Sequence, residues 1–195
     1  MNALATICRS VIFFAIPLAF VFGVAADLGA SSHEGAAKYS EDGALIRPEG
    51  YREWIFVGAP LTPNDMNDGK ATFPEFHSVY MDPGSYAEYK KTGIFRNGTV
   101  LVKELISVGS KKAPSGNGYF MGEFLGLETT IKDSKRFPKE PGNWAYFSFG
   151  KRPNLAATAR KLPAAACNLC HDQNAAEDWV FSQYYPILGA AKPGK

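Results

Sequence analysis

The sequence has little net charge, few cysteines and histidines, and only one long apolar run. Its 21 Lys and Arg residues nearly balance its 19 Asp and Glu residues, which leaves a net charge of +2. This balance excludes the electrostatic footprint of a protein that binds nucleic acid or an anionic membrane surface. No internal repeat and no Gly- or Pro-rich linker divides the chain, which favours a single domain.

The one long apolar run, Val11–Ala26, lies at the N-terminus and follows a short segment whose only charge is Arg9. The run is shorter than the roughly 20 residues that a membrane-spanning helix needs, and it ends in small residues. We therefore predict a cleaved secretory signal over residues 1–26, with cleavage near Ala26. The mature protein is then expected to be periplasmic and free of the membrane, with an uncleaved anchor as the alternative.

The segment behind this signal, residues 27–49, is polar, mixed in charge and rich in small residues. We expect it to form a flexible lead-in. Residues 50–195 then form the domain proper.

Removal of the signal takes away Cys8 and leaves two cysteines, in the sequence Cys167-Asn168-Leu169-Cys170-His171. The pattern Cys-x-x-Cys-His is the attachment sequence for c-type haem. In such a site the two thiols add to the two vinyl groups of the haem, and the adjacent histidine binds the iron. The sequence thus predicts one covalently bound haem c with Cys167 and Cys170 as its anchors and His171 as the iron ligand.

Two other uses of paired cysteines fit this chain less well. A thioredoxin-like redox pair stands near the start of a βαβ unit. This pair lies near the C-terminus of a chain that shows no alternation of strands and helices. A structural zinc site needs two further Cys or His ligands, and only His33 and His77 remain besides His171.

The pattern of apolar residues predicts an antiparallel sheet followed by helices. Strand composition occurs at residues 51–58, 76–81, 99–108, 119–131 and 143–149. A short helix is predicted from Pro83 to Lys91, with Asp82 as its cap and Gly93 at its end. Ala-rich helices are expected at 155–161 and 163–171, and another from Asn174 toward Pro186. The fold class is therefore α+β, with a haem-attachment helix near the C-terminus.

This layout excludes two common cytochrome plans. Small electron carriers have the haem motif early and a methionine ligand late, but no methionine follows Met121 here. Four-helix cytochromes do have a late haem motif, but this chain is too rich in strands before it.

Several long stretches resemble the cytochrome P-460 family of ammonia-oxidising bacteria, and the resemblance runs from Gly50 to Leu188. The stretches are YREWIFVGAPLTPNDMNDG from Tyr51, FPEFHSVYMDP from Phe73, GTVLVKEL from Gly98, GNWAYFSFG from Gly142, and CNLCHDQNAAEDWVFSQYYPIL from Cys167. A sister group, cytochrome c′-beta, is similar in fold but binds gases and lacks the family's characteristic lysine.

The resemblance implies that a lysine amine is bonded to a meso carbon of the haem, beside the two thioethers. The lysine of GTVLVKEL is Lys103. Alternation along this strand places Leu101, Lys103 and Leu105 on one face, where the amine would be desolvated and nucleophilic. From composition alone, an edge-strand lysine that reaches out to water is the alternative.

The resemblance also implies a five-coordinate iron with His171 on its proximal side. The side chains that could close the sixth position are His77, Met66, Met81 and Met121, and we expect the position to stay open. Phe76 and neighbouring aromatic residues are expected to wall the distal pocket.

One departure from the family concerns a distal carboxylate that stands just upstream of the haem motif in some hydroxylamine-oxidising members. Here that stretch is Pro163-Ala164-Ala165-Ala166, and Ala164 aligns with the missing acid. A carboxylate there would accept protons during oxidation, which is a general-base role. Its absence weakens the case for turnover but not for the haem.

The resemblance implies a haem oxidoreductase that oxidises hydroxylamine and passes electrons to soluble c-type cytochromes. The alternatives are a nitric-oxide-binding haem protein without turnover, and a simple electron carrier, which the lack of a late methionine disfavours. A homodimer is a further implication of the family.

Overall fold

The computed structural model of the protein describes residues 36–194, so the predicted signal at residues 1–26 lies outside this range. Within the described part of the chain, no helix is long and apolar enough to cross a bilayer.

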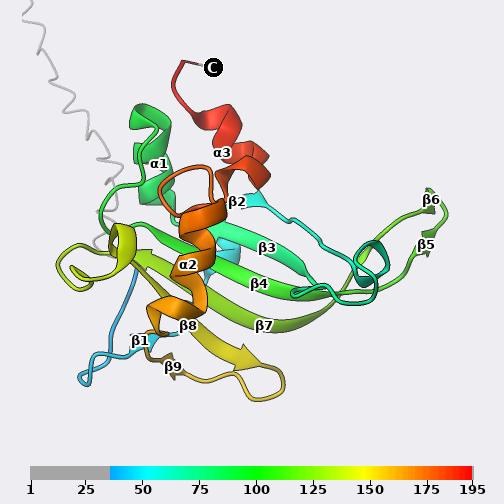
Figure 1. Ribbon diagram of the computed structural model, residues 1–195, viewed down its shortest axis with the longest axis horizontal. Helices are drawn as coiled ribbons and strands as arrows, with labels where there is room; N and C mark the ends of the chain where they lie inside the picture. The colour runs from blue at the N-terminus through cyan, green and yellow to red at the C-terminus, as the bar shows by residue number, and fades with distance from the viewer. Residues whose placement is uncertain (1–35, 195) are drawn as a thin grey trace, which may run out of the picture. The chain divides into compact units, whose positions relative to one another are not determined.

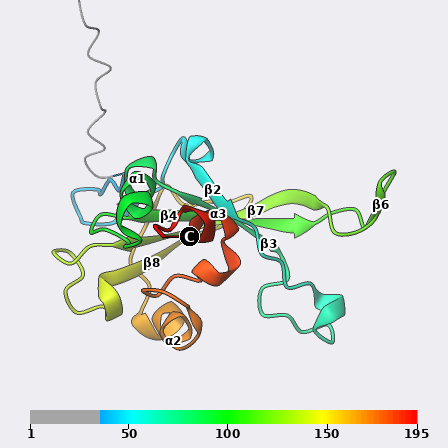
Figure 2. The ribbon, with the colours of Figure 1, turned by 90° about the horizontal axis from the view of Figure 1, so that it is seen from above.

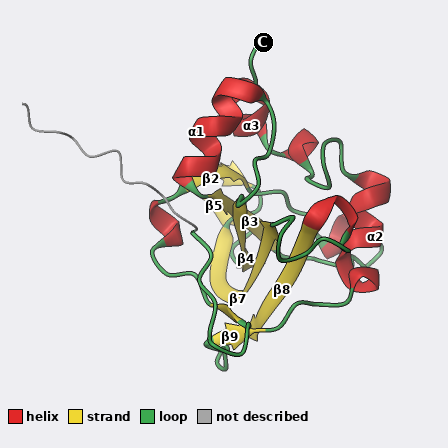
Figure 3. Cartoon of the chain, turned by 90° about the vertical axis from the view of Figure 1, so that its left-hand side faces the viewer, coloured by secondary structure: helices red, strands yellow, loops and turns green. Residues whose placement is uncertain are grey.

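A five-stranded antiparallel sheet organises the domain, as Figure 1 shows. Its strands, in spatial order, are β2 (Ile55–Gly58), β3 (Phe76–Met81), β4 (Val100–Val108), β7 (Met121–Lys132) and β8 (Trp144–Lys151). The helices are α1 (Pro83–Thr92), α2 (Ala164–Asn174) and α3 (Pro186–Ala191). Figure 3 shows α1 and α3 at one end of the sheet and α2 beside β8. The predicted α+β class with an antiparallel sheet is confirmed.

Smaller elements complete the domain. A two-stranded sheet pairs β1 (Leu45–Ile46) with β9 (Thr158–Ala159), and another pairs β5 (Lys112–Ala113) with β6 (Gly116–Asn117). The β5–β6 hairpin projects away from the main sheet in both Figure 1 and Figure 2. The short 3-10 helices are η1 (Tyr51–Glu53), η2 (Asn64–Met66), η3 (Pro141–Asn143) and η4 (Ser182–Tyr184).

Helix α1 forms where the sequence predicted it, for the predicted reason. The Asp82 carboxylate accepts the Ser85 N–H at 2.8 Å, Pro83 occupies the first turn, and Gly93 ends the helix at φ 69°. The same carboxylate accepts the Val100 N–H at 2.9 Å, which ties the start of α1 to β4.

The two faces of the sheet bury two separate cores, because side chains alternate along each strand. One face packs Val100, Val102, Leu127, Ile131 and Phe147 against β1, β9 and η1. The other face packs Val79, Met81, Leu101, Trp144 and Tyr146 against α1, α3 and the segment after α2. The haem motif therefore belongs to the second core.

Two predicted helices are wrong because the backbone finds partners elsewhere. Residues 155–161 carry β9 instead, with Ala159 paired to Leu45 and the Ala157 carbonyl accepting the Arg47 N–H. After α2, no helix opens at Asn174. Its side-chain amide instead donates to the Cys170 carbonyl at 2.9 Å, which satisfies the end of α2.

The structure also differs from the prediction at the first strand and in the segment before it. Of the first expected strand, only Ile55–Gly58 is extended, since Tyr51–Glu53 forms a 3-10 helix. The flexible lead-in is wrong for residues 36–49, because Leu45 is fully buried in the first core and pairs with β9. Residues 27–35 lie outside the described range.

Gly142, in η3 just before β8, explains why the stretch GNWAYFSFG begins with glycine. Its φ is +60°, and a Cβ at this position would lie 2.4 Å from a ring carbon of Trp179. A side chain is therefore excluded both by backbone conformation and by space.

We predict that Gly142→Ala destabilises the protein by about 2–4 kcal/mol, since it combines left-handed strain with overpacking. Gly150→Ala is the matched control: Gly150 has φ +81°, but its nearest atom would be 3.7 Å from a new Cβ. This control should lose only about 1 kcal/mol. Denaturant unfolding of both variants measures the difference, and equal losses would contradict the packing argument.

Candidate functional site

One cavity brings together three of the residues predicted from the sequence. Lys103 enters it from β4, and Cys167 and His171 enter it from α2. The other lining residues are mostly apolar or aromatic: Val79, Leu101, Glu128, Thr129, Thr130, Tyr146, Phe147, Leu162, Trp179, Val180, Phe181 and Tyr185. Most of them come from the sheet face that carries the second core and from the segment after α2, whereas Leu162 lies just before α2 and Phe147 belongs to the first core.

Helix α2 presents Cys167 and His171 on the same side because residues four apart share a helix face. The helix is anchored by Asn168, which is buried and whose side-chain amide donates to the Trp144 carbonyl on β8 at 3.0 Å. Cys170 is exposed and Cys167 is partly buried, and no disulfide joins them. Burial is the main cause that raises the pKa of the Cys167 thiol above its ordinary value.

The His171 ring is fixed by one hydrogen bond and two aromatic contacts. Its Nδ1 lies 2.7 Å from the Trp179 carbonyl oxygen, and its ring centroid lies 4.7 Å from Tyr146 and 4.6 Å from Phe181. Because a carbonyl can only accept, Nδ1 carries the proton and Nε2 keeps a free lone pair. Burial lowers the pKa of His171, which also favours the neutral, metal-binding form.

Lys103 lies on the face that the sequence predicted, on a strand that is not an edge. Strand β4 runs between β3 and β7, so the alternative of an edge-strand lysine is wrong. The register places Lys103 opposite Val79 on one side and Glu128 on the other. Its ammonium lies 2.6 Å from the Glu128 carboxylate, and 27% of its side chain is exposed.

Glu128 is the functional candidate that sequence reasoning missed. It supplies the only carboxylate among the residues that line this cavity. The alternation of β7 could have placed it on the same face as Thr130, but only the strand register brings it against Lys103. The cavity thus holds an acid–base pair beside the haem motif.

Two predicted distal residues do not line this cavity. Ala164 is the first residue of α2, and the lining residue nearby is Leu162, whose N–H donates to the Tyr146 carbonyl at 2.8 Å. Phe76 starts β3 outside the lining. The aromatic ring next to the lysine is that of Phe73, whose centroid is 5.4 Å from Lys103 Nζ.

None of the four candidate sixth ligands lines the cavity. Met81 is fully buried in the second core, whereas Met66 and Met121 are exposed. His77 pairs with Leu105 in the register, and its Nε2 is buried without a hydrogen-bond partner.

The donor set fits a c-type haem. Two thiols and an imidazole with a free Nε2 stand on one helix, and an apolar, aromatic cavity adjoins them. Among residues 36–194, no three His, Cys, Asp or Glu side chains gather in a way that could hold a bare metal ion.

A comparison with models of protein families gives a match over most of the chain. The sequence profile of the family described as cytochrome P-460 matches residues 48–182, which covers the whole sheet and the haem motif. No curated protein matches the chain significantly.

We predict that His77 makes the protein less stable at acid pH. Burial is the main cause that lowers its pKa to about 4, the Lys103 charge adds to this, and Glu75 and Glu128 oppose it. An unfolded histidine titrates near 6.5, so only the unfolded state binds the proton between about pH 4 and 6.5. The contribution of His77 to the free energy of unfolding should thus be fully present above pH 6.5. It should fall by roughly 2–3 kcal/mol as the pH drops toward 4.

His77→Gln should remove this part of the pH dependence. Denaturant unfolding of both proteins at pH 7 and pH 4.5 measures it. Other groups affect the two proteins equally, so an identical loss between the two pH values would show that His77 does not titrate as stated.

Proposed function

Because the chain belongs to the cytochrome P-460 family, and is therefore a haem protein, we propose that it is a periplasmic c-type haem oxidoreductase that oxidises hydroxylamine. The observation that carries the proposal is the single cavity that Lys103, Glu128, Cys167 and His171 share. The cavity lies beside the haem motif and is lined by one lysine and one carboxylate.

In this proposal, Cys167 and Cys170 form the thioethers and His171 binds the iron through Nε2. Held there, the haem would supply an iron centre for binding hydroxylamine and for taking up its electrons. The carbonyl of Trp179 holds the His171 ring, while Tyr146 and Phe181 pack against it and exclude water. Soluble c-type cytochromes are the proposed electron acceptors.

Oxidation of hydroxylamine releases protons together with electrons, so the cavity needs a base. Glu128 is the carboxylate that stands there, ion-paired with Lys103. Lys103 is the proposed site of a covalent bond to the haem edge, since its amine enters the cavity from the sheet opposite α2.

A second candidate function is nitric oxide binding without turnover. It is favoured by the lack of an acid in Pro163-Ala164-Ala165-Ala166 and by the commitment of Glu128 to an ion pair. Steady-state oxidation of hydroxylamine with an artificial electron acceptor separates the two candidates, because only the first predicts turnover.

We predict that Ala164→Glu raises the rate of hydroxylamine oxidation. A carboxylate at the first residue of α2 is compatible with the helix dipole and can extend further toward the cavity than alanine. General-base assistance is typically worth about 10²–10⁴-fold in rate. The measurement is steady-state turnover of the haem-loaded variant against the wild type.

Ala165→Glu is the matched control, because it adds the same charge to the same helical turn at an exposed position. Its rate should equal that of the wild type. Equal rates for all three proteins would contradict the relay position at Ala164.

We predict that a tryptic digest of the haem-loaded protein yields one haem adduct with two peptides. Trypsin does not cut after an alkylated lysine, so the segment Asn97–Lys111 should stay intact at Lys103. The segment Leu162–Lys195 has one internal lysine, Lys192, and the proline that follows blocks cleavage there. Mass spectrometry should find both segments on the same haem.

The variant Lys103→Leu should keep only the segment with the haem motif, and its spectrum should revert toward an ordinary five-coordinate c-type haem. Free Asn97–Lys103 and Glu104–Lys111 from the wild-type protein would overturn the cross-link and favour the gas-binding function.

A further inference from the structure

The segment after α2 contains a tight turn, Glu177–Val180, built on two consecutive left-handed residues. Asp178 has φ +45° and Trp179 has φ +59°, and the Val180 N–H donates to the Glu177 carbonyl at 2.7 Å. Left-handed backbone is uncommon for residues other than glycine, and it persists only where the surroundings enforce it. Two such residues in succession therefore call for a cause.

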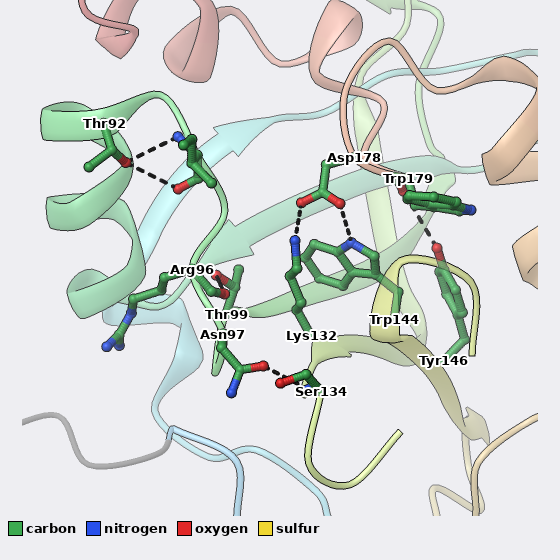
Figure 4. A network of polar contacts seen from close by, with 11 residues as sticks. Thr92, Arg96, Asn97, Thr99, Lys132, Ser134, Trp144, Tyr146, Asp178 and Trp179 are labelled. Carbon is green, nitrogen blue, oxygen red and sulfur yellow. Dashed lines mark hydrogen bonds and ion pairs between the residues drawn. The ribbon is translucent and has the colours of Figure 1, made fainter. Parts of the chain in front are cut away.

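The cause lies first in Asp178, whose carboxylate has a partner on each side. Figure 4 shows it between the Lys132 ammonium, at 2.5 Å, and the indole N–H of Trp144, which donates at 3.3 Å. Lys132 is the last residue of β7, and Trp144 is the first residue of β8. The turn is thus fastened to the end of the central sheet.

The flanking residues of the turn are fastened as well. The Glu177 carboxylate accepts the Tyr89 hydroxyl at 3.0 Å and pairs with Lys192. The Trp179 ring lies against Gly142, and Val180 is buried in the second core. Each residue of the turn therefore has its own contact with a different part of the domain.

Together these contacts fix the position of the Trp179 carbonyl group. The Trp179 oxygen points at His171 Nδ1 at 2.7 Å, and the Tyr146 hydroxyl approaches the same oxygen at 3.5 Å. If the turn relaxed to ordinary backbone angles, the peptide between Trp179 and Val180 would rotate and its carbonyl would leave the histidine.

We propose that Asp178 is a positioning residue for His171 and acts through the Trp179 carbonyl. The clamp on Lys132 and Trp144 holds the turn in its left-handed form, and the carbonyl then fixes the ring orientation and strengthens Nε2 as a ligand. The inference rests on the proposed role of His171 as the iron ligand. It means that Lys132 and Trp144, which lie far from the haem motif in the sequence, influence the orientation of His171.

Two substitutions of Asp178 test the clamp without adding backbone strain. Asp178→Asn removes the charge, and Asp178→Gly removes the side chain, while both residues tolerate left-handed angles. The readout is the stretching band between ferrous iron and histidine in the resonance Raman spectrum of the haem-loaded protein. Both variants should bind haem, and both should show this band shifted to lower frequency and broadened, more so in Asp178→Gly.

Glu140→Gln is the matched control, since it removes a partly buried ion pair with Lys161, 2.7 Å long, that does not contact the turn's carboxylate. It should leave the iron–histidine band unchanged, although its melting temperature should fall like those of the Asp178 variants. An unchanged band in both Asp178 variants, or an equal shift in Glu140→Gln, overturns this inference alone. A wild-type protein without any iron–histidine band overturns the proposed role of His171 together with it.

Discussion

The hydrogen bond from His171 Nδ1 to the Trp179 carbonyl is the contact that the C-terminal third of the domain is arranged to make. A partly buried imidazole N–H left without a partner would cost about 1–3 kcal/mol, and it would leave the ring free to turn. The carbonyl that satisfies it comes from a turn in which two residues adopt angles that cost about 1–3 kcal/mol each. Contacts with β7, β8, α1 and Lys192 hold that turn. The ends of the sheet thus determine how the histidine is oriented.

Because side chains alternate between the two faces of the sheet, neighbouring residues on one strand have different roles. Lys103 and Glu104 are adjacent, yet Lys103 faces the cavity and Glu104 is buried on the opposite face. There the Glu104 carboxylate accepts the Tyr51 hydroxyl at 2.6 Å and Arg52 Nε at 2.7 Å. A buried polar group that loses a hydrogen-bond partner typically costs about 1–3 kcal/mol. The stretch GTVLVKEL therefore serves both the site and the stability of the fold, whereas Tyr51 and Arg52 serve the stability of the fold.

Local signals were sufficient for some elements of this domain. The Asp82 cap with Pro83 and Gly93 predicted α1, and alternation predicted β3 and β4, because each depends on residues close in the chain. The Ala-rich run at 155–161 favoured a helix, but pairing with β1 outweighed its propensity. The capping pattern at Asn174 failed because that side chain bonds backward to Cys170.

Some residues of the site could likewise be predicted from nearby sequence, and others depend on contacts between distant parts of the chain. Cys167, Cys170 and His171 were readable as one motif, since the helix alone sets their spacing. Glu128 was not, because its place opposite Lys103 depends on the register between β4 and β7. The Asp178 clamp joins residues more than 30 positions apart, and no pattern of spacing in the sequence reports it.

The pair of Lys103 and Glu128 connects the two functions that the cavity supports. The Glu128 carboxylate lies 2.6 Å from the Lys103 ammonium, so the ion pair already engages the one carboxylate among the residues that line the cavity. A lysine nitrogen bonded to an unsaturated ring loses basicity, since its lone pair is delocalised into the ring. Under the proposed cross-link, Lys103 no longer needs a counterion, and Glu128 becomes free to accept protons. Without it, the ion pair persists and the cavity suits a ligand that binds without releasing protons. The chemistry of one lysine therefore sets which function the same fold can perform.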